Sequence, residues 1–241
     1  MHAGLPSPPR TIYNGPVIRA AVVTGSARGL GLAVVRALRA AGYGTVSNGR
    51  SSRTGPGHVH VRADAATAAG ARRLVEAARR HFGGLDLLVC NVGDFAYTPV
   101  SEMDLARWEK IFRSNLYSAW HCCRAALPLL RERRGAIVTL GGAGPQVVRA
   151  NPGAVAYQMA KTALAVFTKS LARSEAPRGV RVNMVSPGYI RGGRAALPDA
   201  RIPLGRPAAP EEVARAILWL ASGEASYVTG AVLDVGGGTW L

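Results

Sequence analysis

Apolar and amphipathic segments alternate from residue 17 to the end of the chain. Short apolar runs bounded by glycine or polar residues are typical of buried strands, whereas apolar positions recurring every three or four residues are typical of helices. The pattern predicts strands over 17–23, 43–47, 58–62, 85–89, 136–140, 181–185 and 231–235. It predicts helices over 30–41, 67–81, 105–131, 154–176 and 210–221.

This alternation favours an α/β fold, because continuously apolar strands belong to a parallel sheet with helices on both faces. We expect a single doubly wound Rossmann domain over 17–241, with a sheet of about seven strands. The Pro-rich residues 1–16 are expected to form a flexible extension. Residues 51–57, with Gly55, Pro56 and Gly57, predict a loop between the second and third strands instead of a helix.

Composition narrows the class of protein. No apolar run reaches the roughly 18 residues of a membrane span, and the first 15 residues hold no apolar signal core, so we expect a cytoplasmic protein without membrane attachment. Cys90, Cys122 and Cys123 lack metal-ligand spacing and are expected to be reduced thiols, and no metal site is predicted.

The net charge of +16 comes from arginines spread along the chain, since only three of the 30 basic residues are lysines. There is no basic tail and no patch interleaved with aromatic residues, so nucleic acid is not an expected partner. A positive field raises the capture rate of anions, which favours an acidic substrate or acidic carrier partner.

A glycine-rich turn joins the first strand to the first helix. The text Val-Val-Thr-Gly-Ser-Ala-Arg-Gly-Leu-Gly over 22–31 lets the backbone approach a pyrophosphate, which the helix N-terminus then stabilises. The residues expected to contact a dinucleotide here are Gly25, Ser26, Arg28, Gly29, Leu30 and Gly31.

The end of the second strand indicates which dinucleotide is bound. NAD-binding domains of this kind place a carboxylate there for the ribose 2′-hydroxyl, but residues 47–52 contain none. Arg50 and Ser51, together with Arg28, suit a 2′-phosphate instead, because guanidinium binds phosphate in a bidentate fork. We therefore expect NADPH or NADP+, with NADH less favoured.

Tyr157 and Lys161 stand four residues apart in a predicted helix, so both side chains lie on one face. A lysine ammonium beside a phenol favours the phenolate and is expected to lower the tyrosine pKa from about 10. Such a tyrosine can exchange a proton with a substrate near neutral pH.

Together, Thr-Gly-x-x-x-Gly-x-Gly and Tyr-x-x-x-Lys resemble the fingerprint of the short-chain dehydrogenase/reductase family, and the resemblance extends over 17–241. It implies that Tyr157, Lys161 and Asn115 are catalytic, Asn115 supporting a proton relay to the lysine. It implies further cofactor contacts at Asp64, Ala65, Asn91, Gly93, Pro187, Gly188 and Ile190.

One departure from the family concerns the serine that helps to bind the carbonyl oxygen. Gly142 stands at its place, and no Ser or Thr occurs between Leu140 and Tyr157. Losing such a donor typically costs about a hundredfold in rate. Gln146, Asp94 or Gln158 could substitute, the substrate could polarise its own carbonyl through a neighbouring hydroxyl, or hydride transfer could have been lost.

Expected substrate contacts are Asp94, Gly142, Gln146 and Tyr189, with residues 191–201 lying over an open pocket. The basic residues 131–134 and Arg173 resemble the surface where related reductases receive an acyl carrier protein, although a solvated helix end is the slightly favoured explanation. The helices at 105–131 and 154–173 resemble the family's dimer interface, with Trp120, Leu164, Phe167 and Leu171 as candidate contacts. The resemblance implies a homotetramer or homodimer.

The leading hypothesis is an NADPH-dependent ketoreductase, in secondary metabolism or acting on a polyketide. Gly142 keeps a non-redox enzyme open, such as a dehydratase, cyclase or isomerase on the same scaffold. A protein that binds NADP(H) as a sensor is the third hypothesis, and the intact Tyr157 and Lys161 pair disfavours it.

Overall fold

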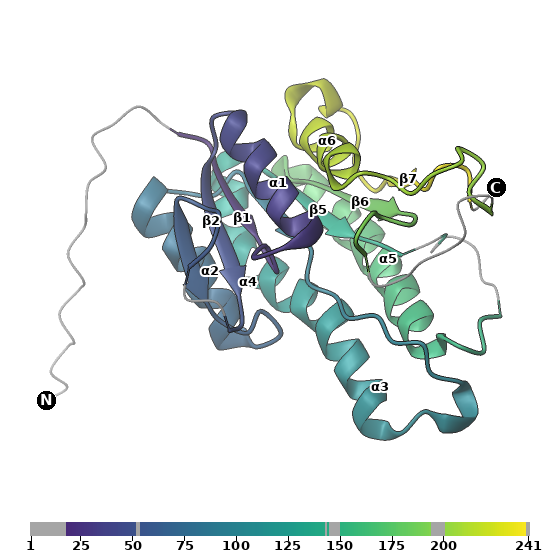
Figure 1. Cartoon of the computed structure of the whole chain (residues 1–241). Coiled ribbons are helices and arrows are strands. Elements are labelled where there is room, and N and C mark those ends of the chain that lie inside the picture. The colour runs from purple at the N-terminus through teal and green to yellow at the C-terminus, as the bar shows by residue number, and fades with distance from the viewer. Residues whose placement is uncertain (1–17, 52–53, 143, 145–149, 194–200, 240–241) are drawn as a thin grey trace, which may run out of the picture.

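Seven parallel strands form one sheet in the order β3-β2-β1-β4-β5-β6-β7 in this computed structural model, which describes residues 18–51, 54–142, 144, 150–193 and 201–239 (Figure 1). The strands are β1 (Ala20–Val23), β2 (Gly44–Gly49), β3 (Val59–Arg62), β4 (Leu87–Cys90), β5 (Ala136–Leu140), β6 (Arg181–Pro187) and β7 (Val232–Val235). The helices are α1 (Gly29–Ala40), α2 (Ala68–Phe82), α3 (Leu105–Phe112), α4 (Ser118–Arg133), α5 (Val155–Glu175) and α6 (Pro210–Ala221). The predicted α/β fold with a doubly wound sheet is confirmed, whereas the expected extension at 1–16 lies outside the described residues.

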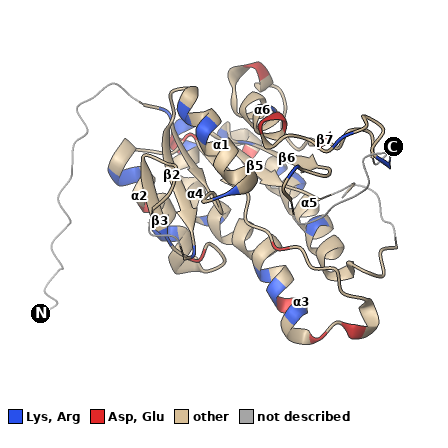
Figure 2. Ribbon diagram, viewed as in Figure 1, with Lys and Arg blue, Asp and Glu red and all other residues tan. Residues whose placement is uncertain are grey.

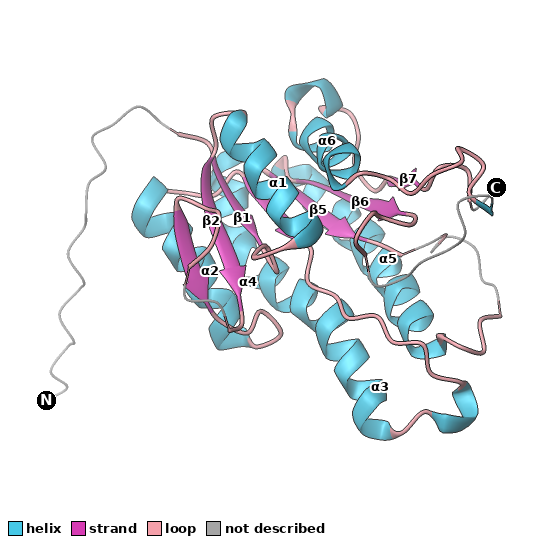
Figure 3. Ribbon diagram, viewed as in Figure 1, coloured by secondary structure: helices cyan, strands magenta, loops and turns pink. Residues whose placement is uncertain are grey.

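Helices cover both faces of the sheet (Figure 3). On one face α2, α4 and α5 pack against Val22, Leu88 and Ile137, and on the other α1 and α6 pack against residues such as Val23 and Val89. Successive strand residues point to opposite faces, so strands covered on both sides are buried at every position, as β1, β4 and β5 are. This explains why these strands are continuously apolar in the sequence.

The chain reverses its direction of winding between β1 and β4, which are neighbours in the sheet. In open α/β sheets, ligands bind outside the carboxyl ends of the strands at this switch point. The glycine-rich turn, the segment after β4 and the segment after β5 all meet there.

Several elements differ from the sequence-based bounds. β4 begins at Leu87 instead of residue 85, and β6 extends to Pro187 instead of ending at residue 185. β2 continues to Gly49 instead of ending at residue 47, because Asn48 ties it to the next strand by donating its amide to the carbonyls of Val61 and Ala63. The helix expected over 105–131 is interrupted by a π-helical turn at Arg113–Tyr117. As expected, no helix lies in the described residues between β2 and β3.

Other composition-based expectations can be compared with the structure. Every helix carries Lys or Arg, and these residues do not gather on a single element (Figure 2). The three cysteines are free and buried, and the described part of the chain contains no group of His, Cys, Asp and Glu able to hold a metal. None of the helices within the described ranges is long and apolar enough to cross a membrane.

Candidate active site

A cleft of about 1440 Å³ opens at the carboxyl ends of the strands. Tyr157, Lys161 and Asn115 line it. The predicted cofactor contacts that also line it are Gly25, Arg28, Gly29, Leu30, Gly31, Arg50, Ser51, Asp64, Ala65, Asn91, Gly93, Pro187, Gly188 and Ile190. Among the expected substrate contacts Asp94, Gly142 and Tyr189 line the cleft, whereas Gln146 lies outside the described residues.

The glycine-rich turn adopts backbone conformations that other residues rarely reach. Gly25 and Gly29 have φ angles of 61° and 56°, in the left-handed region that favours glycine. Gly31 is needed for another reason: a Cβ there would lie 2.6 Å from both the Gly25 carbonyl and the Asn91 amide. The turn therefore presents bare backbone at the N-terminus of α1, which is the geometry that binds a pyrophosphate.

The side chains of Asn91 and Ser26 hold the turn in place. Asn91 donates its amide to the carbonyls of Thr24 and Gly25, both at 3.0 Å. Ser26 is fully buried and its hydroxyl donates to Val23, so Ser26 supports the turn from below and does not line the cleft.

Asn48 belongs to this support and was missed in the sequence. The side-chain oxygen of Asn48 accepts from the Gly25 N–H at 3.2 Å, and the backbone N–H of Asn48 donates to the Ser26 hydroxyl. The only available signal was a polar residue at the end of an otherwise buried strand, and that signal does not identify its partners.

Charged side chains surround the end of the cleft formed by β2 and β3. Nη2 of Arg50 lies 4.0 Å from Oδ2 of Asp94, across the cleft. Nη2 of Arg113 lies 3.9 Å from Oδ2 of Asp64, whose other oxygen accepts from the N–H of Ala66. This end of the cleft thus contains two guanidinium–carboxylate pairs, each joining segments that are distant in the sequence.

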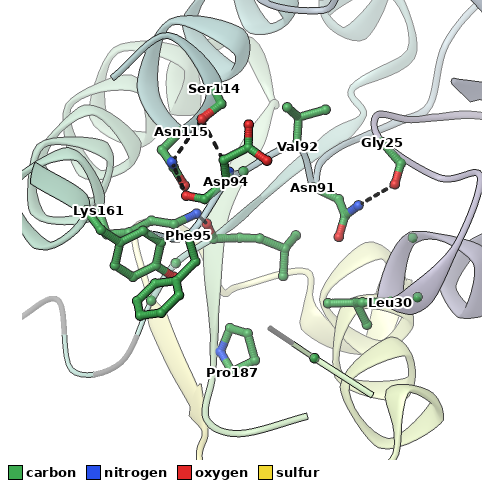
Figure 4. Close-up of a pocket in the computed structure, with 18 of the residues that line it drawn as sticks. Gly25, Leu30, Asn91, Val92, Asp94, Phe95, Ser114, Asn115, Lys161 and Pro187 are labelled. Atoms are coloured by element: carbon green, nitrogen blue, oxygen red, sulfur yellow. Dashed lines mark hydrogen bonds between the residues drawn. The ribbon is translucent and has the colours of Figure 1, made fainter. Parts of the chain in front are cut away.

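At the other end of the cleft, α5 presents Tyr157 and Lys161 on one face. The Lys161 ammonium donates to the Leu140 carbonyl at 2.7 Å and lies 5.7 Å from the centre of the Tyr157 ring. Asn115, in the π-helical turn, donates its amide to the carbonyl of Asp94 (Figure 4) and to that of Ile111.

The side-chain oxygen of Asn115 faces Lys161 across Gly93. A Cβ on Gly93 would lie 2.6 Å from Oδ1 of Asn115 and 3.3 Å from Nζ of Lys161. This Oδ1 is buried and accepts no hydrogen bond from the described residues. A buried acceptor without a partner is rare, and this one is suited to a water or a ligand hydroxyl.

The protonation of the pair differs from the sequence-based expectation. Burial raises the pKa of Tyr157 to about 12 and lowers the pKa of Lys161 to about 8. The expectation that Lys161 lowers the pKa of Tyr157 is therefore wrong for this structure, because the desolvation of the phenol dominates. At neutral pH the phenol is protonated and the ammonium is charged.

Gly142 lies directly against this pair. A Cβ on Gly142 would lie 3.0 Å from the Tyr157 hydroxyl and 3.1 Å from Cγ of Lys161. These distances are shorter than ordinary van der Waals contacts. A side chain at position 142 would therefore crowd Tyr157.

Aromatic rings form the wall beside Tyr157. The Phe95 ring stands nearly perpendicular to the Tyr157 ring, with centroids 5.0 Å apart, and Tyr97 rests on Gly153. Within the segment after β4, the Asp94 carboxylate lies beside Arg50, whereas the neighbouring Phe95 contacts Tyr157. Gln158 also lines the cleft, while residues 194–200 of the expected substrate segment lie outside the described ones.

One expected subunit contact needs correction, and one residue of the expected basic surface is paired within the chain. Leu164 is only 1% exposed, so it belongs to the core and cannot contact a second subunit. Arg131 makes two hydrogen bonds of 2.8 Å to Glu175, and its guanidinium is therefore already paired within the chain. Trp120, on α4, is 40% exposed and remains a candidate contact with a second subunit.

Comparisons with known proteins agree with this architecture. A family model described as enoyl-(acyl carrier protein) reductase matches residues 25–239. The chain is 34% identical to the 3-oxoacyl-(acyl-carrier-protein) reductase of Escherichia coli, over 92% of this chain and 97% of the relative. It is 39% identical to the cis-4-hydroxycyclohexanecarboxylate dehydrogenase of Sinomonas cyclohexanicum, over 91% and 96% respectively.

A solved structure is similar over almost the whole chain. It is a double mutant of a short-chain dehydrogenase/reductase of Serratia marcescens, with a TM-score of 0.85 and 29% identity. The match covers 94% of this chain and 100% of that one.

Proposed function

The chain belongs to the short-chain dehydrogenase/reductase family of oxidoreductases, and on this basis we propose that it reduces a ketone to an alcohol with NADPH. The observation that carries the proposal is the arrangement of Tyr157, Lys161 and Asn115 at one end of a cleft whose other end is a glycine cradle. When bound, NADPH supplies the hydride that adds to the carbonyl carbon.

The cleft residues fit this cofactor. Gly25, Gly29 and Gly31 keep side chains away from the N-terminus of α1, where a pyrophosphate can bind, and a Cβ at Gly31 would disrupt the cradle. Arg50 and Ser51 follow β2, where an NAD-selective domain would have a carboxylate, and they favour a 2′-phosphate. Arg28 lies at the start of α1, where it can bind the same phosphate.

Tyr157 is the proposed proton donor to the carbonyl oxygen. Because its pKa is raised to about 12, the phenol carries its proton at neutral pH and has it to donate. Lys161, with a pKa of about 8, is mainly charged at neutral pH and can bind the nicotinamide ribose. The free Oδ1 of Asn115 can accept from a water that returns a proton toward Lys161. Phe95 packs nearly perpendicular against the Tyr157 ring and helps to hold it in place.

The relatives suggest how the substrate is presented. One of them is named for reducing 3-oxoacyl groups on acyl carrier protein, and another for oxidising a hydroxylated ring carboxylate. We propose a carbonyl substrate that is either free or carried by an acyl carrier protein, including polyketides and other secondary metabolites. A homotetramer or homodimer is the proposed assembly.

Steady-state oxidation of NADPH over a panel of ketones and 3-oxoacyl thioesters tests the proposal. Tyr157→Phe removes the proton donor, so kcat should fall by about a hundredfold or more. NADP+ binding by that variant, measured by calorimetry, should change little. Tyr97→Phe removes an exposed phenol from the same cleft and should retain most of the activity. Unchanged turnover in Tyr157→Phe would contradict the role proposed for Tyr157.

Gly142 favours a second candidate, a non-redox enzyme such as a dehydratase, cyclase or isomerase. With glycine there, Tyr157 lacks the second hydroxyl that normally binds the carbonyl oxygen. Such an enzyme turns over substrate with no net oxidation of NADPH. Quantifying NADP+ against product by mass spectrometry separates the two, since reduction requires one NADP+ for each alcohol formed.

A further inference from the structure

We propose that Asp94 reduces the preference of this protein for NADP(H) over NAD(H), because its carboxylate competes with the cofactor 2′-phosphate for Arg50. The inference rests on the proposed function. It assigns Asp94 to cofactor selectivity instead of the substrate contact expected from the sequence.

The sheet order places these two residues on opposite sides of the phosphate cradle. Arg50 follows β2 and Asp94 comes four residues after the end of β4, and β1 runs between those strands. Strands in a sheet lie about 4.8 Å apart, so the ends of β2 and β4 are separated by about 10 Å. The distance of 4.0 Å between Nη2 of Arg50 and Oδ2 of Asp94 therefore means that the arginine reaches across the end of β1, where the cradle begins.

Asp94 is the fixed partner of the pair. Its N–H donates to the Ser114 hydroxyl at 3.2 Å, and its carbonyl accepts from the Asn115 amide at 2.8 Å (Figure 4). Its side chain is 16% exposed, whereas that of Arg50 is 67% exposed. The guanidinium is thus the more exposed group and can move between partners, whereas the main chain of Asp94 is held and its carboxylate is largely buried.

The second carboxylate at this end of the cleft is already engaged. Asp64 accepts from the N–H of Ala66 and lies 3.9 Å from Arg113. The backbone carbonyl of Arg50 accepts from Nε of Arg62 at 3.3 Å, which fixes the main chain and leaves the Arg50 guanidinium to the cleft. Asp94 is consequently the carboxylate that the structure pairs with Arg50.

The competition depends on the nucleotide. A 2′-phosphate can take the Arg50 guanidinium only if the guanidinium leaves Asp94 or is shared with it, and the carboxylate repels the phosphate. NAD(H) has a 2′-hydroxyl instead, so the pair with Asp94 can persist when it binds. Asp94 therefore disfavours NADP(H) more than NAD(H).

Calorimetric dissociation constants for NADP+ and NAD+ test this inference on the full chain. Exposed or partly exposed ion pairs contribute little, so we expect Asp94→Asn to raise the ratio of NADP+ to NAD+ affinity by about two- to fivefold. Glu76→Gln is the matched control, because it removes a negative charge paired with Arg79 and Arg80 on α2, outside the cleft, and should leave the ratio unchanged.

The same substitution in an Arg50→Ala background separates competition from a general charge effect. If Asp94 acts through Arg50, Asp94→Asn should no longer change the ratio in that background. An equal gain for both nucleotides, or a gain in the ratio that persists without Arg50, would overturn the inference while leaving the proposed reductase intact. If the unaltered protein bound neither nucleotide, the proposed function and the inference would both fall.

Discussion

At the scale of single residues, Gly142 stands where the resemblance to the family leads us to expect a serine. The space beside it is not empty, since Tyr157 Oη lies 3.0 Å from the place of a Cβ. A serine added here would bring a hydroxyl and also crowd the proposed proton donor. Its effect therefore depends on whether Tyr157 can shift by a few tenths of an ångström.

We predict that crowding dominates. Gly142→Ser and Gly142→Ala should each lower kcat by about tenfold, in line with the sensitivity of catalysis to small displacements. Steady-state kinetics of both variants provides the measurement, with alanine as the control that adds the Cβ without the hydroxyl. A serine variant faster than the glycine protein, together with a slower alanine variant, would show that the missing hydroxyl limits the rate.

The burial of the Lys161 ammonium destabilises the folded state, whatever the outcome for its proposed catalytic role. Its folded pKa of about 8 lies below the usual 10.5, so the folded state binds the proton less well than the unfolded state. The free energy of unfolding therefore rises with pH between about 8 and 10.5, where the unfolded state binds more protons. Below pH 8 the lysine is charged in both states, and the full cost of burying its charge applies. The penalty at pH 7 is at most roughly 3 kcal/mol.

Lys161→Met should therefore raise the melting temperature at pH 7 by several degrees while abolishing turnover. Differential scanning calorimetry at pH 7 and pH 10 measures this, and the gain should shrink at the higher pH. Lys169→Met, on the exposed side of α5, is the control for loss of one charge. A lower melting temperature at pH 7 would contradict a desolvation penalty at Lys161.

At the scale of elements, the π-helical turn Arg113–Tyr117 determines where Asn115 sits. Such turns leave backbone carbonyls without their usual partner, and they are frequent at functional sites. Here the Asn115 amide donates to the Ile111 carbonyl at 3.0 Å and to that of Asp94. The same side chain thus stabilises the irregular helix and holds the segment after β4 against it.

The ends of α4 and α5 are joined by a pair that should make stability depend on pH. Hydrogen bonds from Arg131 lower the pKa of Glu175 below its usual 4.5, and the Glu175 side chain is only 4% exposed. A carboxyl with a lowered folded pKa stabilises the protein above about 4.5, and this contribution is lost as the pH falls through the folded value.

Glu175→Gln should lower the free energy of unfolding at pH 7 and flatten its decline below pH 4.5. Urea unfolding at a series of pH values measures both effects. Glu132→Gln removes a neighbouring charge from α4 and should keep the decline. An unchanged pH profile in Glu175→Gln would exclude this pair as a contributor to acid stability.

At the scale of the whole molecule, α4 and α5 carry apolar side chains on the surface as well as in the core. Met159 and Val166, seven residues apart on one face of α5, are 48% and 62% exposed, and Trp120 on α4 is 40% exposed. Exposed apolar residues gathered on neighbouring helices are typical of a subunit interface. They fit the dimer contact that the family resemblance implies.

Val166→Glu should therefore reduce the mass of the assembly, because it places a charge in the proposed contact. Light scattering coupled to size-exclusion chromatography gives that mass. Leu204→Glu, at a position that is 73% exposed and remote from α5 in the sequence, should leave it unchanged. The proposed contact on α5 is wrong if the unaltered protein has the mass of a single subunit.

The sequence alone determined the features that depend on local pattern. Buried strands are apolar at every position, and the glycines of the cradle recur at fixed spacing, so the fold and the turn over Gly25–Gly31 could be predicted. Tyr157 and Lys161 lie on one face of α5 because they are four residues apart, which is also a local property. The expected loop between β2 and β3 follows from the glycines and the proline in that segment.

Only the tertiary structure decided the features that depend on distant segments. Asn48 supports Gly25, and Arg50 reaches Asp94, because the sheet order brings the ends of β2, β1 and β4 together. The raised pKa of Tyr157 follows from burial, which overrides the effect expected from a lysine four residues away. Periodicity specifies which residues share a face, whereas burial and contacts between strands depend on how the whole chain packs.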